Sequence, residues 1–359
     1  MRILHVITSL KTGGAERLMV DLLPLIRSIG HHNVDLLVFN GMRTPFMEML
    51  EERNIKILKL SMGGNVYNPL NIFRLVRYMS SYDIIHTHNT ACQLFTPIAK
   101  LIAFALTPLV TTEHSSNNRR RAKRWFKPID KWMYNRYASV VCISDKSTQN
   151  LESYLGKRKG IVTISNGVDT ARFIRPVKDV SLNQQFVITM VAGLRIEKDH
   201  ETVLKAMTHL PDNYSLKLVG DGVKADALKK MTTDLGLDDR VTFMGVRQDV
   251  PDILEQSDIV VLSSHWEGLS LSSIEGMASG RPFVASDVDG LHEMVSGAGV
   301  LFEHGNDKDL AEKIQWLCEH PEEYRKVAQC CQDKARQYDI SVMAEKYLKL
   351  YNRLRHESR

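Results

Sequence analysis

Hydrophobic residues in the first half of the chain gather in short runs separated by amphipathic stretches. Six runs rich in β-branched and other apolar residues predict buried strands, at residues 3–8, 34–39, 55–60, 83–88, 108–113 and 139–144. Between them, residues 15–29 and 68–79 carry apolar side chains at helical spacing. Strands that alternate with helices in this way indicate a parallel, doubly wound sheet.

The second half repeats this pattern. Five more runs predict strands, at residues 186–193, 214–220, 240–245, 258–264 and 281–286. Helical patterns begin at His200, Val223, Val250, Ser270 and Asp307. The periodicity is lost at residues 174–184, which we interpret as a linker. The pattern predicts an α/β protein with Rossmann-like domains at residues 1–174 and 175–340, followed by a last segment, residues 341–359, that opens with an amphipathic helix.

The most apolar stretch, residues 94–110, contains Pro97, Lys100 and Pro108. A helix that spans a bilayer needs about 20 consecutive apolar residues, and this stretch has 17 residues in all. We therefore interpret it as a buried helix that runs into a strand. The composition agrees with a globular enzyme of two domains, since 43% of the 359 residues are hydrophobic and 25% are charged.

Charge is distributed unevenly along the chain. Residues 1–170 contain 23 Lys and Arg against 12 Asp and Glu, whereas residues 171–359 contain 24 against 30. Such asymmetry suggests that the first half meets an anionic surface. The five cysteines show no CxxC spacing, which disfavours a disulfide framework or a zinc site and favours reduced thiols in the cytosol. We therefore expect a cytoplasmic protein.

Two cations lie where a predicted strand of the second half meets a helix. Arg195 and Lys198 would stand at the carboxyl end of a parallel strand, where doubly wound folds bind their ligands. An arginine can grip a diphosphate in a fork, and a lysine adds a mobile point charge. The alternative is a solvated loop, which this position in the fold disfavours.

Two glutamates follow the strand predicted at residues 258–264. Glu267 lies in a loop and Glu275 lies in the helix that begins near Ser270, so both lie near one face, since eight residues make about 2.2 helical turns. Glu267 can accept hydrogen bonds from sugar hydroxyls and Glu275 from ribose hydroxyls, while the helix N-terminus offers N–H groups to phosphate. A capped surface helix is the alternative, but the small and apolar neighbours of Glu275 favour a buried functional acid.

Glycines and histidines stand at strand ends of the first domain. Gly13 and Gly14 separate the first strand from the first helix, where glycine permits close backbone approach to a phosphate or sugar, although a plain turn is the alternative. His86, His88 and His114 end two neighbouring strands. We interpret His86 and His88 as core histidines, and we expect His114 to contact a donor sugar or a developing charge.

Two other strings suggest chemistry that we disfavour. Residues 220–225 spell GxGxxA, but they follow the second strand of their domain, whereas a dinucleotide site follows the first. Asp287 and Asp289 form a DxD string, which can hold Mg²⁺ or Mn²⁺ between phosphates, but they follow a different strand from Glu267. We interpret the DxD string as a turn, and we expect no metal and no cofactor.

An ordered set of motifs resembles glycosyltransferase family 4, the retaining GT-B sugar transferases. The motifs are GGAE (13–16), SNGVD (165–169), LRIEKDHE (194–201), VGDG (219–222), VTFMG (241–245) and EGLSLSSIEGMASG (267–280), and the resemblance covers almost the whole chain. It implies a GT-B fold whose two domains face a cleft, a last helix that crosses back to the first domain, and a UDP- or GDP-sugar donor used with retention and without metal.

The resemblance also implies site residues. Those implied to bind the donor are Gly13, Gly14, Arg195, Lys198, Gly245, Val246, Arg247, Glu267, Gly268, Leu269, Ser270 and Glu275, and those implied in catalysis are His114, Glu267, Arg195 and Lys198. Within this set, Glu267 would contact the sugar, Glu275 the ribose, and residues 245–247 the nucleobase. The chain departs from the family at Gly193, where many members place the arginine.

The segment from Asn118 to Tyr137 combines eight cations with a single acid, Asp130. Its interleaved large apolar residues are Trp125, Phe126, Trp132, Met133 and Tyr134. Interfacial helices combine rings with Lys and Arg in this way, so we expect peripheral docking on an anionic membrane or a lipid-linked acceptor. The alternative is a loop and a helix, starting or kinked at Pro128, whose rings face the core. No nucleic-acid-reading motif accompanies the cations, so we expect no nucleic-acid partner.

The sequence thus favours an enzyme of the EC 2.4 class, a hexosyl- or related transferase. It would move a sugar from a UDP- or GDP-sugar to a glycan or lipid-linked saccharide during surface polysaccharide biosynthesis. Two alternatives stay open. The first is a nucleotide-sugar epimerase of GT-B fold, which needs no acceptor. The second is a non-catalytic protein that binds sugar nucleotides, although the presence of both cations and both glutamates argues against it.

Overall fold

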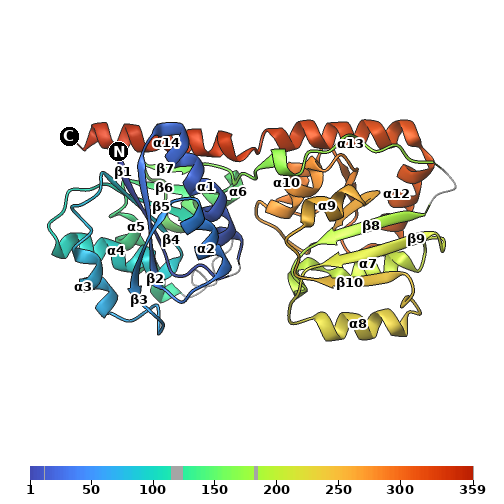
Figure 1. Ribbon diagram of the computed structural model, residues 1–359, viewed down its shortest axis with the longest axis horizontal. Coiled ribbons are helices and arrows are strands. Elements are labelled where there is room, and N and C mark those ends of the chain that lie inside the picture. The colour runs from blue at the N-terminus through green and yellow to red at the C-terminus, as the bar shows by residue number, and fades with distance from the viewer. Residues whose placement is uncertain (12, 115–123, 182–184, 359) are drawn as a thin grey trace. The chain divides into compact units, whose positions relative to one another are not determined.

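The computed structural model describes residues 1–11, 13–114, 124–181 and 185–358, and it divides into two compact units. Unit 1 consists of Met1–Gly167 and Ile340–Arg359, and unit 2 of Val168–Asp339. Each unit is built on one parallel sheet with helices on its faces (Figure 1). The chain therefore leaves unit 1 once and returns to it for its last helix.

Seven strands form the sheet of unit 1, in the order β3-β2-β1-β4-β5-β6-β7. They are β1 (Arg2–Ile7), β2 (Asn33–Asn40), β3 (Lys56–Ser61), β4 (Ile84–His88), β5 (Leu109–Glu113), β6 (Ser139–Cys142) and β7 (Ile161–Thr163). All neighbouring pairs are parallel. The first six confirm the strands predicted from the sequence, whereas β7 has three residues and is too short to give a pattern of its own.

Helices cover both faces of this sheet and enclose two apolar cores. One core contains side chains from α1 (Gly14–Gly30), α2 (Pro45–Glu52) and α14 (Ile340–Glu357). The other contains side chains from α3 (Leu70–Val76), α4 (Thr90–Ile102), α5 (Lys127–Tyr134) and α6 (Asp145–Leu155). Because both faces are covered, the strands read as continuous apolar runs rather than as alternating ones.

The apolar stretch at residues 94–110 is a helix that runs into a strand, as predicted. It comprises most of α4, a connection and the start of β5, and Pro97 lies inside the helix. Pro128 stands in the first turn of α5. The N–H groups of the first turn have no partner within the helix, so the N–H that proline lacks costs no hydrogen bond there. In the part of the chain that the structure describes, no helix combines the length and apolarity needed to cross a bilayer.

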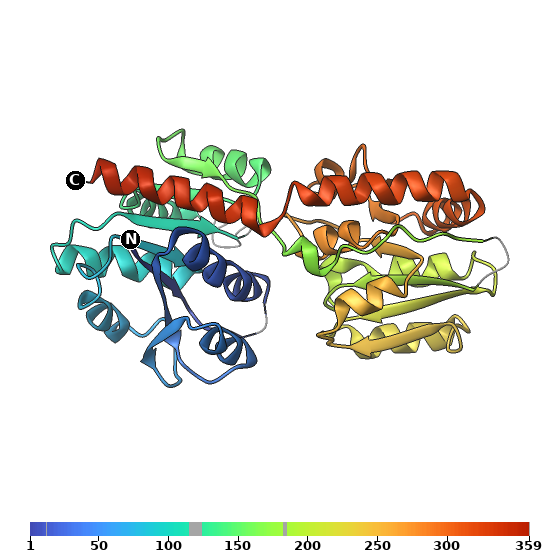
Figure 2. The same cartoon turned by 45° about the horizontal axis from the view of Figure 1, so that its top comes forward.

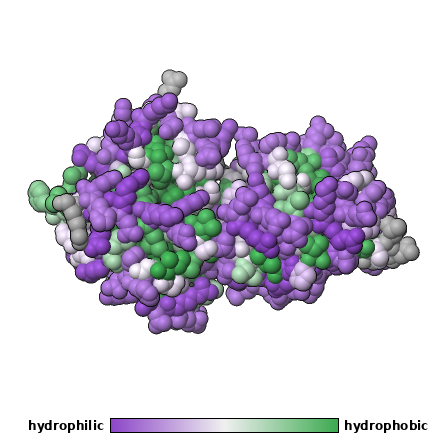
Figure 3. Space-filling model, turned by 90° about the horizontal axis from the view of Figure 1, so that it is seen from above, coloured by the Kyte–Doolittle hydropathy of each residue, from purple (hydrophilic) through white to green (hydrophobic). Residues whose placement is uncertain are grey.

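The last helix, α14, packs its apolar side against unit 1 and contacts α1 (Figure 2). Tyr347 and Tyr351 are fully buried on that side. The predicted amphipathic helix at residues 341–354 is thus confirmed, with its core side set by spacings of three and four residues. Helix α13 (Pro321–Arg336) belongs to unit 2. Seen from above, each unit presents a mostly hydrophilic surface with smaller hydrophobic areas (Figure 3).

Six strands form the sheet of unit 2, in the order β10-β9-β8-β11-β12-β13. They are β8 (Phe186–Val191), β9 (Tyr214–Val219), β10 (Val241–Gly245), β11 (Ile259–Leu262), β12 (Phe283–Ser286) and β13 (Val300–Phe302). The remaining helices are α7 (His200–Met207), α8 (Ala225–Asp234), α9 (Val250–Glu255), α10 (Leu271–Ala278), α11 (Leu291–Val295) and α12 (Asp307–Glu319). Within the described ranges of both units, short 3₁₀ turns occur at η2 (Arg124–Phe126), η3 (Thr170–Arg172) and η4 (Ile196–Lys198).

Strand order reverses once in each sheet. In unit 1 the reversal lies between β1 and β4, and in unit 2 it lies between β8 and β11. At such a switch point the loops leave the carboxyl edge of the sheet in opposite directions and open a crevice, which is where doubly wound sheets bind ligands. These two edges are therefore where functional residues are expected.

Candidate active site

The switch point of unit 2 brings the predicted cations and the first predicted glutamate together. Arg195 and Lys198 follow β8, and Glu267 follows β11, the neighbouring strand. Lys198 Nζ forms an ion pair with Glu267 Oε1. Residues 69 positions apart thus meet at the carboxyl edge of the sheet.

The ion pair is shielded from solvent and held by a third side chain. The side chains of Lys198 and Glu267 are 19% and 10% exposed. Ser264 Oγ donates a hydrogen bond to the same Oε1 atom at 2.8 Å. Because the pair is largely withdrawn from water, salt screens it less than an exposed pair. An anionic ligand that binds Lys198 must therefore compete with the carboxylate of Glu267.

Side chains of the strand end fix the loop that carries Lys198. Ser263 Oγ donates to the carbonyl oxygens of Lys198 at 3.1 Å and of Asp199 at 2.8 Å. Asp199 in turn caps α7, because its carboxylate accepts hydrogen bonds from Thr202 N and Oγ1. Sequence reasoning missed this supporting set, and its only signal there is a pair of serines at the end of a buried strand.

Arg195 differs from Lys198 in its surroundings. Its side chain is 61% exposed, and its Nη1 atom lies 3.8 Å from Glu197 Oε1. An exposed ion pair of this kind contributes little to the free energy of folding, so the guanidinium is available to an anionic ligand. Gly193, where many family members carry the arginine, leaves room for the guanidinium: a Cβ there would lie 3.3 Å from Arg195 Nε.

Helix α10 places the second glutamate behind a helix N-terminus. Ser270 precedes the helix in an extended conformation and makes no side-chain cap, so the first-turn N–H groups are open to an anion. Glu275 lies in the second turn and is half-buried. Gly276 lets the helix approach the sheet, since a Cβ there would lie 2.7 Å from the Phe283 ring and 2.9 Å from Val260.

The turn that contains the DxD string packs on the loop that carries Glu267, and one of its two acids bonds a histidine of α11. Asp287 Oδ1 lies 2.6 Å from His292 Nδ1. Gly290 adopts φ +87°, and a Cβ there would lie 2.4 Å from the carbonyl oxygen of Gly268 and 2.5 Å from that of Glu267. The backbone at Gly290 therefore packs directly against the loop that carries Glu267.

The GxGxxA string has a packing role in the structure. A Cβ at Gly220 would lie 2.0 Å from the carbonyl oxygen of Ala192, and one at Gly222 would lie 2.3 Å from that of Leu194. These glycines therefore allow the loop after β9 to pack on the loop that leads to Arg195. The structure gives them a reason that involves no nucleotide.

The residues predicted to border a nucleobase follow β10, at the far edge of the same sheet. Gly245 ends the strand with φ +65°, and its carbonyl oxygen accepts a hydrogen bond from Gly220 N at 2.9 Å. Val246 is 72% exposed. Arg247 Nε donates to Asp249 Oδ1 at 2.8 Å, and both side chains are exposed. An exposed apolar side chain beside an exposed guanidinium suits a flat heterocycle.

In unit 1, the predicted glycines stand at the switch point. Gly13 caps α1 and Gly14 begins it, both after β1. A Cβ at Gly14 would meet no atom within 4 Å, whereas a Cβ at Gly13 would lie 2.3 Å from Glu16 Oε2. Gly14 therefore borders open space at the start of a helix, where a backbone N–H can reach an anionic ligand.

His114 follows β5 and is half-buried. Its Nε2 atom lies 2.9 Å from Nδ1 of His88, which is buried at the end of β4. Burial lowers the pKa of His114 to about 4 and keeps the pKa of His88 well below its usual value. Both rings are therefore neutral at pH 7. His86, predicted as a core histidine, is buried and bonds Tyr351 and Thr112.

The basic segment from Asn118 to Tyr137 is described only in part. Residues 118–123 lie outside the described residues. From there on, Trp125 and Ile129 are 62% and 41% exposed, whereas Met133 and Tyr134 are fully buried in the core. The prediction that Met133 and Tyr134 belong to a membrane-facing set is thus wrong, because α5 turns that side toward the sheet.

Among the residues that the structure describes, two groups of side chains have nitrogen and oxygen atoms close enough together to hold a metal ion. They are His5, His86 and His88 in unit 1, and Asp199, His265 and His304 in unit 2. In the second group, His265 Nδ1 lies 2.7 Å from His304 Nε2 and 3.7 Å from Asp199 Oδ2. A hydrogen bond between the two rings explains the shorter distance. The carboxylate of Asp199 already accepts hydrogen bonds from Thr202 as the cap of α7, which explains its position.

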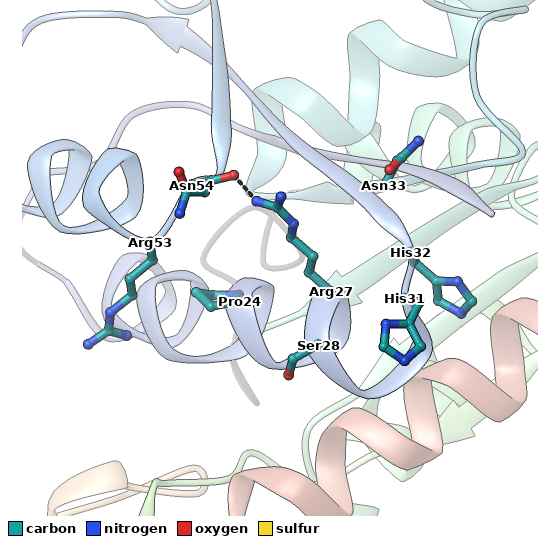
Figure 4. Close-up of a pocket in the computed structure, with 8 residues that line it drawn as sticks. All are labelled: Pro24, Arg27, Ser28, His31, His32, Asn33, Arg53 and Asn54. Atoms are coloured by element: carbon teal, nitrogen blue, oxygen red, sulfur yellow. Dashed lines mark hydrogen bonds between the residues drawn. The ribbon is translucent and has the colours of Figure 1, made fainter.

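A surface pocket of unit 1 lies at the opposite end of its sheet from Gly14 and His114. It is lined by Pro24, Arg27, Ser28, His31, His32, Asn33, Arg53 and Asn54 (Figure 4). Arg27 bonds the carbonyl oxygen of Asn54 across it. Because Asn33 begins β2, the pocket borders the amino ends of the strands, away from Gly14 and His114.

Known proteins match this chain along nearly its whole length. The family described as Glycosyltransferase Family 4 matches residues 12–172, and the family described as Glycosyl transferases group 1 matches residues 174–333. The Anabaena protein Alr3699/HepE, solved in complex with UDP, has a TM-score of 0.85 and 24% identity over 98% of this chain and 100% of that chain. Together with the two parallel sheets, this similarity confirms the predicted GT-B fold.

Two bacterial relatives carry specific names. One is the Escherichia coli UDP-Gal:alpha-D-GlcNAc-diphosphoundecaprenol alpha-1,3-galactosyltransferase, 29% identical over 258 residues, which are 66% of this chain and 65% of that protein. The other is the Campylobacter jejuni GalNAc-alpha-(1->4)-GalNAc-alpha-(1->3)-diNAcBac-PP-undecaprenol alpha-1,4-N-acetyl-D-galactosaminyltransferase, 25% identical over 98% of both chains. The two family matches adjoin and together cover most of the chain, so this chain belongs to glycosyltransferase family 4, the group 1 glycosyl transferases.

Proposed function

We propose that this chain is a retaining glycosyltransferase that moves a sugar from a UDP-sugar to a lipid-linked saccharide during surface polysaccharide synthesis. The observation that carries the proposal is the set of Arg195, Lys198, Glu267 and the α10 N-terminus at the switch point of unit 2. Two relatives are named for undecaprenol-diphosphate-linked saccharides, and the Anabaena protein was solved with UDP. These names support the donor and acceptor classes.

The proposed chemistry assigns the cations to the leaving group. When the bond between the sugar and the diphosphate breaks, negative charge grows on the diphosphate. Arg195, Lys198 and the open N–H groups before α10 would stabilise that charge in the transition state. As Lys198 turns toward the diphosphate, Glu267 loses its partner and gains lone pairs for the hydroxyls of the donor sugar.

The remaining predicted residues complete the proposed site. Glu275 would accept hydrogen bonds from the ribose, and Val246 and Arg247 would border the uracil ring. In unit 1, Gly14 would admit the diphosphate or the acceptor, and His114 would touch the donor sugar.

We also propose that transfer needs no divalent metal. Positive charge is already supplied by Arg195, Lys198 and a helix N-terminus. Asp287, half of the DxD string, is bonded to His292. Turnover should therefore persist in excess EDTA. Loss of turnover on chelation, restored by Mg²⁺ or Mn²⁺, would assign a metal role to the DxD string.

Product analysis with purified protein tests the function. We expect transfer from a UDP-hexose or UDP-N-acetylhexosamine to a saccharide on undecaprenyl diphosphate, with an α-linkage visible in the anomeric coupling of the product. No reaction is expected from donor alone. An epimerised donor in the absence of acceptor would favour the epimerase. Donor binding without turnover across a panel of such acceptors would favour a non-catalytic binding protein.

Membrane contact is part of the same proposal, and unit 1 is the part that would make it. The described cations next to exposed Trp125 are Lys127, Lys131 and Arg136. Helix α4, which contacts α5, ends at Ile102, and the connection after it carries Phe104 and Leu106, whose side chains are 91% and 87% exposed. Exposed apolar side chains beside cations are typical of surfaces that sit on anionic lipid. A lipid-linked acceptor would be met at such a surface.

A further inference from the structure

Histidines are concentrated beneath His114 on one face of the unit 1 sheet. His5, His86 and His88 are 0%, 0% and 1% exposed. His5 and His86 are paired on the neighbouring strands β1 and β4, and His88 lies two residues further along β4. Because side chains alternate along a strand, His86 and His88 share a face. His114 follows β5, the next strand of the sheet.

Three of these rings form a continuous hydrogen-bonded row. Nε2 of His114 lies 2.9 Å from Nδ1 of His88, and Nε2 of His88 lies 3.0 Å from Nδ1 of His5. The rings of His5 and His88 are stacked at an interplanar angle of 7°. Within the described residues, Nε2 of His5 is buried and has no hydrogen-bond partner. The row therefore begins in the apolar core and ends at His114.

The row has two possible polarities, because each neutral ring carries one N–H. Burial lowers the pKa of His5 to about 3 and that of His114 to about 4, so all three rings are neutral at pH 7. In one polarity every N–H points inward, and the last one, on Nε2 of His5, is buried without an acceptor. In the other polarity every N–H points toward His114, and a lone pair is left in the core.

The second polarity is favoured, because a buried N–H without an acceptor is rarer in folded proteins than a buried lone pair without a donor. We propose that His5 and His88 are positioning residues that hold His114 in its Nδ1–H tautomer, so that the ring presents a hydrogen-bond donor to the donor sugar. This inference rests on the role proposed for His114. Among the described residues, Nδ1 of His114 has no partner within the protein, which leaves it free for a ligand.

A metal ion bound by His5, His86 and His88 is the competing use of the same cluster, since their ring nitrogens lie within 4.8 Å of one another. However, both nitrogens of His86 already bond oxygen atoms, Tyr351 Oη at 2.5 Å and Thr112 Oγ1 at 2.7 Å. Both nitrogens of His88 belong to the row. An ion could be bound only by breaking these hydrogen bonds, so the row accounts for the geometry better.

The test reads the tautomer directly, without substrate. Protein labelled with ¹⁵N-histidine would be examined at pH 7.5 by two-bond ¹H–¹⁵N correlation, with the His114 signals assigned through His114→Gln. We expect Nδ1–H for His114 in the wild type and in His5→Asn, whose side-chain amide can donate from the place of Nδ1. In His5→Leu, which cannot donate, we expect a mixture of tautomers and a kcat about tenfold lower, the usual effect of one hydrogen bond.

His86→Gln is the matched control, because His86 packs on the rings of His5 and His88 but bonds other partners. It should leave the His114 tautomer unchanged. Three results would each overturn the row. The first is an Nε2–H tautomer of His114 in the wild type, and the second is an unchanged tautomer in His5→Leu. The third is an equimolar metal ion in the purified protein that is lost when His5 is mutated. A changed tautomer with unchanged turnover would uphold the row and overturn the role proposed for His114 instead.

Discussion

At the scale of single residues, a bound donor would change the ion pair between Lys198 and Glu267 most. The two side chains neutralise each other at 19% and 10% exposure. A diphosphate would replace the carboxylate as the partner of Lys198. Variants that remove the charge of either Lys198 or Glu267 and leave the other can therefore separate the roles proposed for these two side chains.

We expect Lys198→Ala and Arg195→Ala each to lower kcat by about 10²–10³, the effect of removing one preorganised group that stabilises charge in a transition state, or about 2.7–4 kcal/mol. Steady-state kinetics with the UDP-sugar measures this. Lys205→Ala, which removes an exposed lysine from α7, is the control.

Wild-type turnover in Lys198→Ala would contradict the donor site. Because that variant leaves Glu267 without a cation, the double variant Lys198→Ala/Glu267→Gln should recover stability but not activity. A weak effect in Arg195→Ala alone would show that its place three residues before the lysine weakens its role.

The two glutamates should separate binding from turnover. Ribose contacts are made in the ground state and the transition state alike, so we expect Glu275→Gln to weaken UDP binding about 10–100-fold, the range for one hydrogen bond to a charged group. Glu267→Gln should mainly lower kcat. Calorimetry with UDP, together with kinetics, ranks the two variants, and the reverse ranking would exchange their roles.

At the scale of elements, glycines hold the site loops against one another. Gly220 and Gly222 bring the loop after β9 onto the loop after β8, and Gly290 brings the loop after β12 onto the loop after β11. In each case the neighbour is a backbone carbonyl oxygen, which cannot swing away as a side chain can. The loops after β8, β9, β11 and β12 therefore support one another.

Gly290→Ala should displace the glutamate loop. Its Cβ would lie 2.4 Å from the carbonyl oxygen of Gly268, and its φ is +87°. We expect kcat to fall by up to about 10²-fold, since a shift of 1 Å can change catalysis by that much. Gly297→Ala is a matched control, because its φ is +77° and its Cβ would meet no atom within 4 Å.

Both variants should lose stability by roughly 1–2 kcal/mol through the left-handed backbone. Only Gly290→Ala should lose turnover as well. Equal kinetics in the two variants would show that the contact between Gly290 and the glutamate loop does not position Glu267.

At the scale of the whole molecule, buried neutral histidines make the fold sensitive to acid. Burial lowers the pKa of His200 from 6.5 to about 4, and neither of its ring nitrogens has a partner among the described residues. The unfolded chain binds a proton there below pH 6.5, whereas the folded chain binds it only near pH 4. Stability is therefore complete above pH 6.5 and falls as the pH drops toward 4.

We expect His200 to remove about 2 kcal/mol of unfolding free energy between pH 7.5 and pH 5.0. Urea unfolding of wild type and His200→Leu at both pH values measures this, because leucine does not titrate. The difference between the two proteins should change with pH by that amount. A difference independent of pH would show that His200 binds its proton at the same pH in the folded and the unfolded protein, and so that burial does not lower its pKa.

Membrane docking can be tested with vesicles of anionic lipid. We expect co-sedimentation at low salt that falls at high salt and is lost when Arg119, Arg120, Arg121 and Arg124 are changed to Glu, since each cation that meets anionic lipid contributes about 1 kcal/mol. The matched control changes Lys229, Lys230, Lys308 and Lys326 of unit 2, all exposed, to Glu. Equal binding of all three proteins, or none, would remove the membrane proposal and leave the transferase untouched.

The sequence by itself determined the features that depend on neighbouring residues. Runs of apolar residues predicted eleven strands of the two sheets, and Pro128 marked the start of α5. The placing of Arg195, Lys198 and Glu267 at carboxyl ends also followed, because it needs only the end of a strand and the rule that parallel strands end at one edge. The short strands β7 and β13 were not predicted, since three residues do not establish a period.

Only the tertiary structure decided which of these residues touch. The pair Lys198–Glu267 joins positions 69 apart, and the row of His5, His88 and His114 joins three strands whose order the sequence does not state. Burial was also decided there: Met133 and Tyr134 share a segment with exposed Trp125 but face the core. Local pattern sets the conformation of each element, whereas contacts and burial depend on strand order and on which helix covers which face.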